Sequence, residues 1–436
     1  MIKQALLNSR LVISLSILIF LLSISILNAQ STEADFLLYS PSPVITGMGG
    51  AGTAIPTEDP YNFFYNPAQL GLIDSNTNIS LGIYPSSVNL SPFTEVLFDN
   101  YAIQGGYDFS KLLGGFPLKI GAGILYQGID FGEFFRAHES GQILSKLHLY
   151  EKAGTFSIGF GFNYFIKIAG GISYKLIRSY NDLFSYSDST FNSTQGNADA
   201  FDLGILVDVP IITKMPLGKN LNFNLSASSG YTFANWGSAM IYTGSYSASS
   251  GPIARTVRLG YGLSAGIDYK YKETVYKLLQ IDWSSEANDL LVEMVEKIYP
   301  PDTVYTYGYK SPLGDINIWD NVIMMKNNSS SVVNRHGVKF SILETADISF
   351  GRYGLPGTYG KLLGSTFGFS ASTKGLMKFL SQEIKNDIIE FIAKHISLQY
   401  SNSTIKYDDR KDEDGNTYKY PGQNYNALYL AISGLW

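Results

Sequence analysis

The feature that most restricts the fold is a strict alternation of large apolar and small or polar residues from Thr256 to Tyr271. One face carries side chains such as Val257 and Tyr269, and the other carries glycines, Ser264 and charged residues. A period of two indicates a β-strand, and the run is longer than the ~3 to 10 residues usual for strands of soluble proteins. It predicts a strand of a membrane barrel, with one face toward lipid and the other toward the lumen.

Similar runs recur along the chain, which predicts an all-β membrane protein with about fourteen antiparallel strands, within the range of bacterial barrels. The other runs cover residues 76–86, 98–109, 118–131, 152–164, 166–178, 199–210, 219–232, 274–284, 334–344, 346–353, 363–374, 395–407 and 424–436. With 43 glycines, 31 tyrosines, 26 phenylalanines and 16% charged residues, the composition is unusual for a soluble enzyme of 436 residues. No long apolar run follows Leu27, so a spanning chain must close its sheet, because open edges leave unpaired amides in hydrocarbon.

The predicted connections nearly alternate between long and short, as they do between outer loops and periplasmic turns. The long ones are residues 132–151, 179–198, 233–255, 285–333 and 408–423. Residues 374–394 fall on the short side, yet their helical spacing predicts an amphipathic helix against the barrel rim or the membrane surface. A second helix is predicted at 285–298, because Ser284 or Ser285 suits its N-cap and prolines follow it.

The first 29 residues have the features of a signal peptide. Lys3 and Arg10 precede an apolar run from Leu11 to Leu27, and Ala29 offers a small residue for cleavage. A retained membrane anchor is the alternative, although the serines in the run make it marginal for a spanning helix. The chain has no cysteine, which excludes a lipoprotein anchor, disulfides and thiol catalysis.

Residues 30–75 are expected to form a plug or hatch before the barrel of residues 76–436. The stretch from Thr46 to Leu72 is rich in glycine in its first half and contains an Asn-Pro-Ala turn, so its backbone bends tightly. The predicted plug or gating residues are Gly47, Met48, Gly49, Gly50, Gly52, Asn66, Pro67 and Ala68. The spacing Gly47-x-Gly49-x-x-Gly52 also matches a dinucleotide fingerprint, but Pro43 and Pro56 disrupt the strand and helix that this motif requires.

The last predicted strand carries Leu428, Leu430 and Ile432 in register with the terminal Trp436. A terminal aromatic residue on such a strand resembles the signal by which the barrel assembly machinery recognises outer-membrane proteins. Trp436 is therefore the predicted assembly signal, although a soluble sandwich also ends in an apolar strand.

No pattern in the chain predicts an enzyme, a cofactor or a metal site. The four histidines lack ligand spacing. Gly262-Leu263-Ser264-Ala265-Gly266 matches a nucleophile elbow, but it lies within a predicted strand rather than at a strand-to-helix turn. The acidic run from Asp408 fails as an EF-hand because Arg410 stands at the first ligand position. We interpret it as a charged hairpin tip turning at Asp414-Gly415, with a divalent-ion or lipopolysaccharide contact as the alternative.

The N-terminal motifs resemble those of FadL-like outer-membrane barrels, and are most similar to the PorV and PorQ branch. The resemblance rests on Phe36-Leu37-Leu38, Gly47-Met48-Gly49-Gly50-Ala51, Thr53-Ala54, Asp59-Pro60 and Asn66-Pro67-Ala68. It implies a fourteen-stranded barrel whose first segment folds into or beneath the lumen.

The resemblance implies two alternative roles for a protein of a Gram-negative outer membrane. PorV-like proteins act in type IX secretion, with secretion machinery and exported cargo proteins as partners, and this is the preferred expectation. FadL-like channels instead admit hydrophobic small molecules. Outer-membrane lipid and lipopolysaccharide are expected around either protein, and a net charge of −5 argues against nucleic acid.

Overall fold

The computed structural model describes residues 32–73, 77–91, 94–138, 141–185, 190–244, 250–272, 274–299, 302–326, 329, 331–356, 362–411, 417–419 and 422–434. The predicted signal peptide, the turn at Asp414-Gly415 and the terminal Trp436 lie outside these residues.

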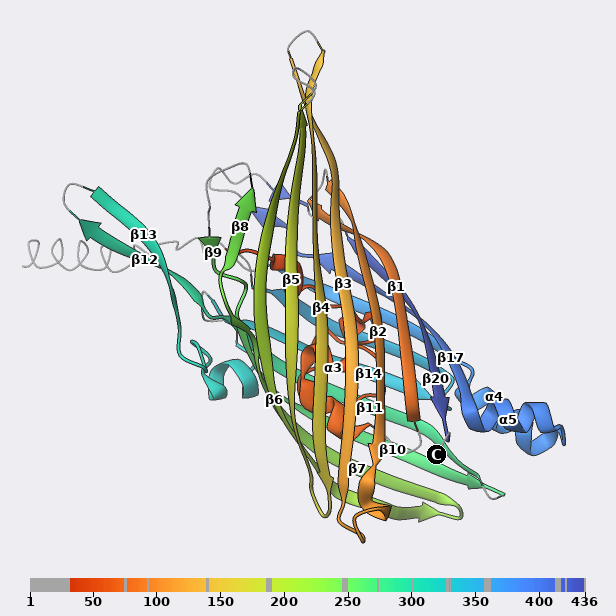
Figure 1. Cartoon of the computed structure of the whole chain (residues 1–436). Coiled ribbons are helices and arrows are strands. Elements are labelled where there is room, and N and C mark those ends of the chain that lie inside the picture. Colours follow the sequence, from red (N-terminus) through yellow and green to blue (C-terminus); the bar gives the residue numbers. More distant parts are fainter. Residues whose placement is uncertain are drawn as a thin grey trace, which may run out of the picture.

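Fourteen antiparallel strands close into a barrel, because the first strand pairs with the last (Figure 1). They are β1 (Thr77–Ser91), β2 (Thr94–Asp108), β3 (Leu118–Ala137), β4 (Ile143–Asn163), β5 (Lys167–Ser185), β6 (Thr190–Gly218), β7 (Leu221–Gly237), β10 (Thr256–Tyr271), β11 (Thr274–Leu290), β14 (Val333–Ile342), β15 (Ala346–Leu355), β16 (Leu362–Ser372), β17 (Ile396–Tyr407) and β20 (Gln423–Ser433). Each overlaps a predicted run, although β3 to β6 extend well beyond the predicted bounds, so the predicted barrel is confirmed.

Residues that alternate in the sequence lie on opposite faces of the barrel wall, one face toward the lumen and the other outward. In β16, Thr366 and Gly368 are buried toward the lumen, whereas Phe367 and Phe369 are exposed on the outer face. Large apolar side chains are similarly exposed on the outer face of the other strands. A closed sheet with an apolar outer face satisfies every ladder amide internally and presents hydrocarbon to lipid, as a transmembrane barrel must.

The barrel end where β20 ends has mostly short turns, whereas the other end has the long connections from β7 to β10, from β11 to β14 and from β17 to β20. At the long-connection end, β8 (Met240–Gly244) and β9 (Ser250–Gly251) extend the sheet beside β6. Two small hairpins, β12 (Val292–Tyr299) with β13 (Asp302–Tyr309) and β18 (Arg410–Lys411) with β19 (Thr417–Tyr418), stand apart from the barrel sheet. We call these two ends the turn end and the loop end.

Strands β3 to β6 extend well beyond the other strands at the loop end (Figure 1). The predicted loops at 132–151 and 179–198 are therefore wrong over most of their length. Their polar residues pair across strands instead: the rings of Tyr150 and Tyr180 stack with centroids 4.6 Å apart, and His148 Nε2 lies 2.9 Å from an Asp130 oxygen. Such cross-strand pairs stabilise a sheet without an apolar face.

The helix predicted at 285–298 is also wrong. Strand β11 continues to Leu290, and β12 then pairs with β13. Both faces of β11 are buried here, because Glu286 points to the lumen while Ala287 packs against Val322 of the loop outside. Sheet pairing and burial on two faces outweigh the local capping signal.

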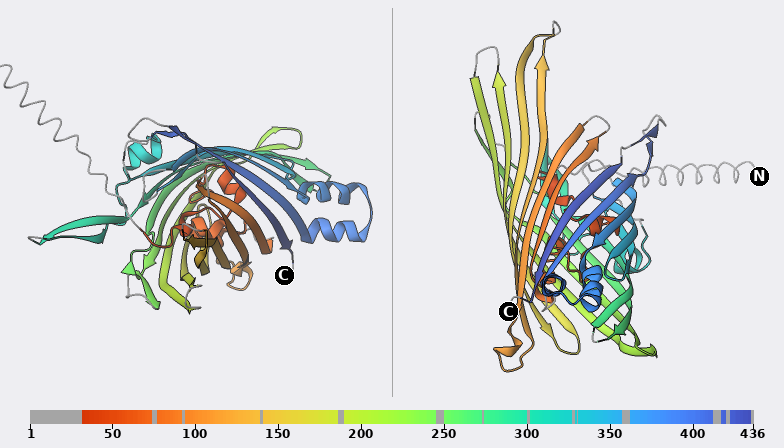
Figure 2. Two further views of the ribbon diagram at one scale, coloured as in Figure 1. Left: turned by 90° about the horizontal axis from the view of Figure 1, so that it is seen from above. Right: turned by 90° about the vertical axis from the view of Figure 1, so that its right-hand side faces the viewer.

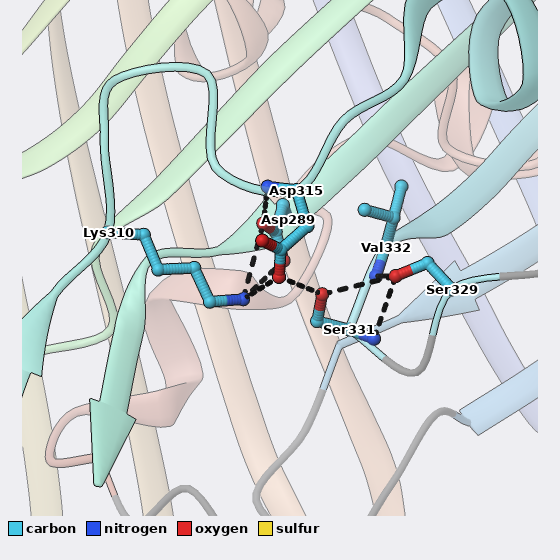
Figure 3. Close-up of polar contacts among 6 residues, drawn as sticks. All are labelled: Asp289, Lys310, Asp315, Ser329, Ser331 and Val332. Carbon is cyan, nitrogen blue, oxygen red and sulfur yellow. Dashed lines mark hydrogen bonds and ion pairs between the residues drawn. The ribbon is translucent and has the colours of Figure 1, made fainter. Parts of the chain in front are cut away.

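Polar contacts hold the connection from β13 to β14 against the end of β11 (Figure 3). The Lys310 ammonium lies 3.3 Å from Asp289 and 2.6 Å from Asp315. The backbone N–H of Asp315 donates to Asp289, and Ser331 donates to Asp315. The connection also contains the short π-helix η4 (Ile318–Ile323), and it covers the outer face of the wall at this point.

At the turn end, residues 374–394 form two helices, α4 (Lys374–Glu383) and α5 (Asp387–His395), where a single amphipathic helix was predicted. Asn386 separates them, because its side chain caps the N-terminus of α5 by accepting from two backbone N–H groups. A 3-10 turn, η3 (Phe109–Lys111), lies in the β2–β3 connection. Every helix within the described ranges is too short or too polar to cross a bilayer.

Candidate functional site

Residues 32–73, which we call the luminal segment, run inside the barrel (Figure 2). They contain four short helical turns: η1 (Asp35–Leu38), α2 (Pro43–Gly47), α3 (Asn62–Tyr65) and η2 (Pro67–Leu72). The Ser42 hydroxyl caps α2 by accepting from the N–H of Ile45 at 3.2 Å. Nearly all side chains of the luminal segment are buried, so it packs against the barrel wall and against itself along most of its length.

The predicted residues Gly47, Met48, Gly49 and Gly50 lie together against β14, β15 and β16. Gly49 and Gly50 have φ angles of 72° and 76°, which glycine adopts without strain. A Cβ atom on Gly49 would lie 2.5 Å from the carbonyl oxygens of His336 and Arg352. Side chains are therefore excluded here both by the backbone angles and by the wall.

The wall opposite this stretch is built from small residues. A Cβ atom on Gly337 or Gly351 would overlap the backbone of the luminal segment. Thr366 binds that backbone on both sides, because its hydroxyl donates to Gly47 O at 2.9 Å and accepts from Gly49 N at 3.1 Å. Two backbones thus meet in van der Waals contact, which glycine on both sides permits.

The predicted Asn66-Pro67-Ala68 turn lies elsewhere on the wall, against β3 to β6. The Asn66 side chain accepts from Ala68 N and donates to the carbonyl oxygens of Thr53 and Ile205, all within 3.0 Å. It therefore fixes the turn and attaches it to β6. The wall is again glycine here: a Cβ atom on Gly159 would lie 2.7 Å from the N atom of Gly71.

The remaining predicted residue, Gly52, packs inside the luminal segment itself. A Cβ atom at this position would lie 2.7 Å from the ring of Tyr65 and 2.8 Å from Ile45. The structure thus separates the predicted residues into two wall contacts and one internal contact.

Buried charges of the wall bind the luminal segment, and sequence reasoning did not single them out. Glu286 accepts from Thr53 N at 3.0 Å and lies 3.5 Å from Arg335, with side chains 0% and 2% exposed. Arg258 donates to Phe64 O at 3.3 Å. The sequence does place Arg258 on the lumen face of its strand. A buried charge is costly unless it is paired, so this placement could have indicated a partner inside the lumen.

A different contact joins the luminal segment to β1, β2 and β20. Tyr39 and Tyr61 of the segment pack edge-on against wall rings, and the ring centroids are 5.9 to 6.5 Å apart. Tyr61 also donates to Asn100 O at 3.0 Å. The wall rings are Tyr84, Phe98, Tyr425 and Tyr429. We call Tyr39, Tyr61 and these four wall rings the aromatic seam. Edge-on ring pairs contribute about 0.5 to 1.5 kcal/mol each.

Below the luminal segment, toward the turn end, lies a cavity of about 590 Å³, which we call the vestibule. Its wall carries charged side chains of both signs together with apolar ones such as Leu72 and Ile73. Lys167 pairs with Asp208 at 2.8 Å, and Lys339 pairs with Asp282 at 3.2 Å. Each of these pairs joins two neighbouring barrel strands, so ion pairs between strands form part of the vestibule wall beneath the luminal segment.

Asp59 of the luminal segment lies where the aromatic seam meets the vestibule. Its carboxylate accepts from Ser42, from Tyr61 N at 2.8 Å and from the Tyr429 hydroxyl at 3.5 Å. Burial raises the pKa of this carboxyl to about 6, although these hydrogen bonds oppose the rise. Asp59 is therefore a titratable contact between the segment and the wall.

The motifs considered for catalysis form no site in the described part of the chain. Ser264 lies within β10, where its hydroxyl donates to Asp282 at 2.6 Å, rather than at an exposed turn. No cluster of histidine and carboxylate side chains with metal-binding geometry occurs among the described residues.

No family model matches the chain, and no curated protein matches its sequence. Among solved structures, it is similar to a TodX deltaS2S3 mutant monoaromatic hydrocarbon channel, at 10% identity over 91% of this chain and 98% of that chain, with a TM-score of 0.43. It is also similar to the P. putida toluene transporter TodX (8% identity, 91% and 97% covered, TM-score 0.37) and to a Pseudomonas aeruginosa FadL homologue (8%, 88% and 95%, 0.38). These likenesses do not confirm the PorV and PorQ branch.

Proposed function

We propose that this protein is an outer-membrane channel for small apolar compounds in a Gram-negative bacterium, closed at rest by the luminal segment acting as a plug. The turn end then faces the periplasm and the loop end faces the outside, as in other bacterial barrels. Apolar compounds are the class of solute that a lipopolysaccharide surface retards, so a channel serves them.

The aromatic seam is the observation that carries this proposal. A solute that passes the luminal segment must separate it from the wall, and the glycine-lined contacts at Gly351 and Gly159 leave no room for this without breaking backbone packing. At the seam the segment meets the wall through ring contacts, through Gly82 of β1 against the Tyr61 ring, and through a few hydrogen bonds. An apolar solute replaces ring contacts, whereas an ion would lose its hydration there at a cost of several kcal/mol.

The vestibule gives the solute an exit. It begins at Asp59, directly beneath the seam, and is lined by polar side chains such as Lys167 and Gln280 together with apolar ones such as Leu72. An apolar compound that has passed the seam crosses the vestibule to the periplasm. The direction of uptake is then set by consumption of the compound inside the cell, and a binding site for the compound in the vestibule is not required.

A second candidate function is the secretion role that the N-terminal motifs imply. The extension of β3 to β6 beyond the barrel, and the hairpin of β12 and β13, offer surfaces outside the membrane for an exported protein (Figure 1). In that case the lumen stays closed, and the barrel serves as a platform.

Probe uptake in cells tests the channel proposal. We expect expression in a heterologous Gram-negative host to raise the entry rate of 1-N-phenylnaphthylamine, an apolar aromatic probe, and to leave the entry of nitrocefin, a charged one, unchanged. A Gly154→Val variant serves as a control, since a Cβ atom there meets nothing within 4 Å. Equal entry of the apolar probe with and without the protein would reject the channel proposal.

A deletion strain separates the two candidates. The channel predicts lost growth on hydrophobic carbon sources with normal secretion. Retention of exported proteins in the periplasm, with normal growth on those compounds, would establish the secretion role instead.

A further inference from the structure

Helices α4 and α5 form a hairpin that projects sideways from the outer wall at the turn end (Figures 1 and 2). The two helices pack side by side and connect β16 to β17. A short turn would suffice to join two neighbouring antiparallel strands. The hairpin is thus an addition to the barrel, and the channel function does not require it.

One side of the hairpin is tied to the barrel by polar contacts. Lys374 lies 2.9 Å from Glu58 of the luminal segment, and Lys378 lies 2.6 Å from Glu344 of the β14–β15 turn. The far end of α4 is held by Lys272, which lies 2.9 Å from Glu383. These contacts fix the orientation of the hairpin on the wall.

Other side chains of the hairpin are large, apolar and exposed to between 45 and 69%. They are Leu376, Phe379, Ile384, Ile388 and Phe391. Apolar residues at three-residue spacing on both helices are not used for packing against the barrel. A soluble surface rarely carries so many exposed large apolar residues in so short a segment.

These residues continue an apolar surface that already faces lipid. The strand that follows α5 exposes Leu398 and Tyr400 on the outer wall, and the β14–β15 turn beneath α4 exposes Leu343. Lys385 and Lys394 are exposed beside the apolar residues, where cations favour phosphate groups. An amphipathic helix with this composition and placement is suited to the interface between headgroups and acyl chains.

We propose that the α4–α5 hairpin lies in the periplasmic leaflet of the outer membrane, with these apolar side chains among the phospholipid acyl chains. This inference rests on the membrane orientation given under the proposed function, but not on the solute. The hairpin widens the footprint of the barrel in that leaflet, and through Lys374 and Glu58 it connects the leaflet to the luminal segment.

Spin labelling of the full chain in phospholipid vesicles tests the proposal. The chain has no native cysteine, so Phe379→Cys and Phe391→Cys each give a single label site, and Glu390→Cys provides a control on the same hairpin. Heat-modifiable mobility on gels verifies that each variant has folded. We expect labels at 379 and 391 to collide more often with oxygen than with a water-soluble nickel chelate, and the label at 390 to show the reverse order.

Two outcomes would overturn the proposal. Labels at 379 and 391 that collide mainly with the nickel chelate would place the hairpin in water. Dipolar broadening that disappears when labelled protein is diluted with unlabelled protein would show that a second copy covers the apolar side chains. Either result would leave the channel proposal intact, because probe uptake measures that separately.

Discussion

The luminal segment meets β14 to β16 and β3 to β6 through glycines on the wall, and meets β1, β2 and β20 through the aromatic seam. On the glycine side, backbone contacts backbone, as between Gly49 and Gly351, and buried charges such as Glu286 add hydrogen bonds. On the seam side, rings such as Tyr61 and Tyr84 pack at 6.5 Å. Backbone packing tolerates almost no displacement, whereas each ring pair contributes only about 0.5 to 1.5 kcal/mol and its contacts can be replaced by those of an apolar solute. We infer that the glycine contacts hold the segment in place. The segment separates from the wall at the aromatic seam when a solute passes.

The largest effect is expected from the double variant Gly49→Val and Gly50→Val. Each valine adds about 1 to 3 kcal/mol of backbone strain at positive φ, and the wall carbonyl oxygens leave no space for the side chain at Gly49. The segment should leave the wall while the barrel stays folded, and planar-bilayer recordings should show raised, noisy conductance. Gly141→Val is the matched control, with a φ of 83° and nothing within 4 Å of its Cβ atom. Unchanged conductance in the double variant would contradict the holding role of the glycine side.

A somewhat smaller effect is expected from Glu286→Gln. The change leaves the buried Arg335 without its carboxylate and weakens the bond to Thr53 N, and breaking a buried pair typically costs about 3 to 5 kcal/mol. Proteolysis of the luminal segment from the periplasmic side should become faster. Glu383→Gln, which breaks the exposed pair with Lys272, should change the rate little. Equal cleavage rates in the two variants would show that the buried charges do not hold the segment.

Asp59 should make the closure depend on pH. Its pKa in the docked state is raised from 3.8 to about 6, so docking is most stable below the lower value and loses that contribution as the pH rises through the higher one. The shift corresponds to roughly 3 kcal/mol at most. Openings should become rarer as the pH falls from about 7 to about 4, and Asp59→Asn should remove the dependence. A variant that keeps the full pH dependence would assign it to another group.

The smallest effect is expected at the seam itself. Tyr84→Leu keeps an apolar side chain but removes ring contacts with Tyr61, Phe98 and Tyr425, each contributing about 0.5 to 1.5 kcal/mol. Entry of the apolar probe should rise a few-fold while the entry of nitrocefin stays unchanged. Tyr101→Leu on the outer face is the control. A rise in nitrocefin entry as well would mean that the seam does not select against charge.

The barrel could be predicted well from the sequence because the residues of each strand alternate between the lipid-facing and the lumen-facing side of the wall. The run at 363–374, for example, needed nothing but its own pattern to predict β16. The helix predicted at 285–298 failed because Ser285 and Glu286 make a good helix start in isolation, while partners distant in sequence bury both of their faces. Contacts with residues so distant in the sequence cannot be recognised from the local sequence pattern.

The residues at the contact between the luminal segment and the wall also divide into those that the sequence predicted and those that it did not. Glycine and Asn-Pro-Ala are recognisable from the sequence because they impose backbone geometry, so Gly49 and Asn66 were singled out. Tyr84 and Glu286 were not, because an inward-facing tyrosine or glutamate on a strand looks the same whether it touches water or a folded segment. Only the closure of the barrel brings these side chains to the luminal segment.

The most direct measurement is the conductance of a barrel from which residues 32–73 have been deleted. The strand ladder does not involve these residues apart from one isolated bridge at Glu33, so the barrel should still show heat-modifiable mobility on gels. We predict a large, steady conductance for the deletion variant and a closed or rarely open state for the full chain in the same bilayers. A folded deletion variant that conducts no better than the full chain would contradict the claim that the luminal segment closes this channel.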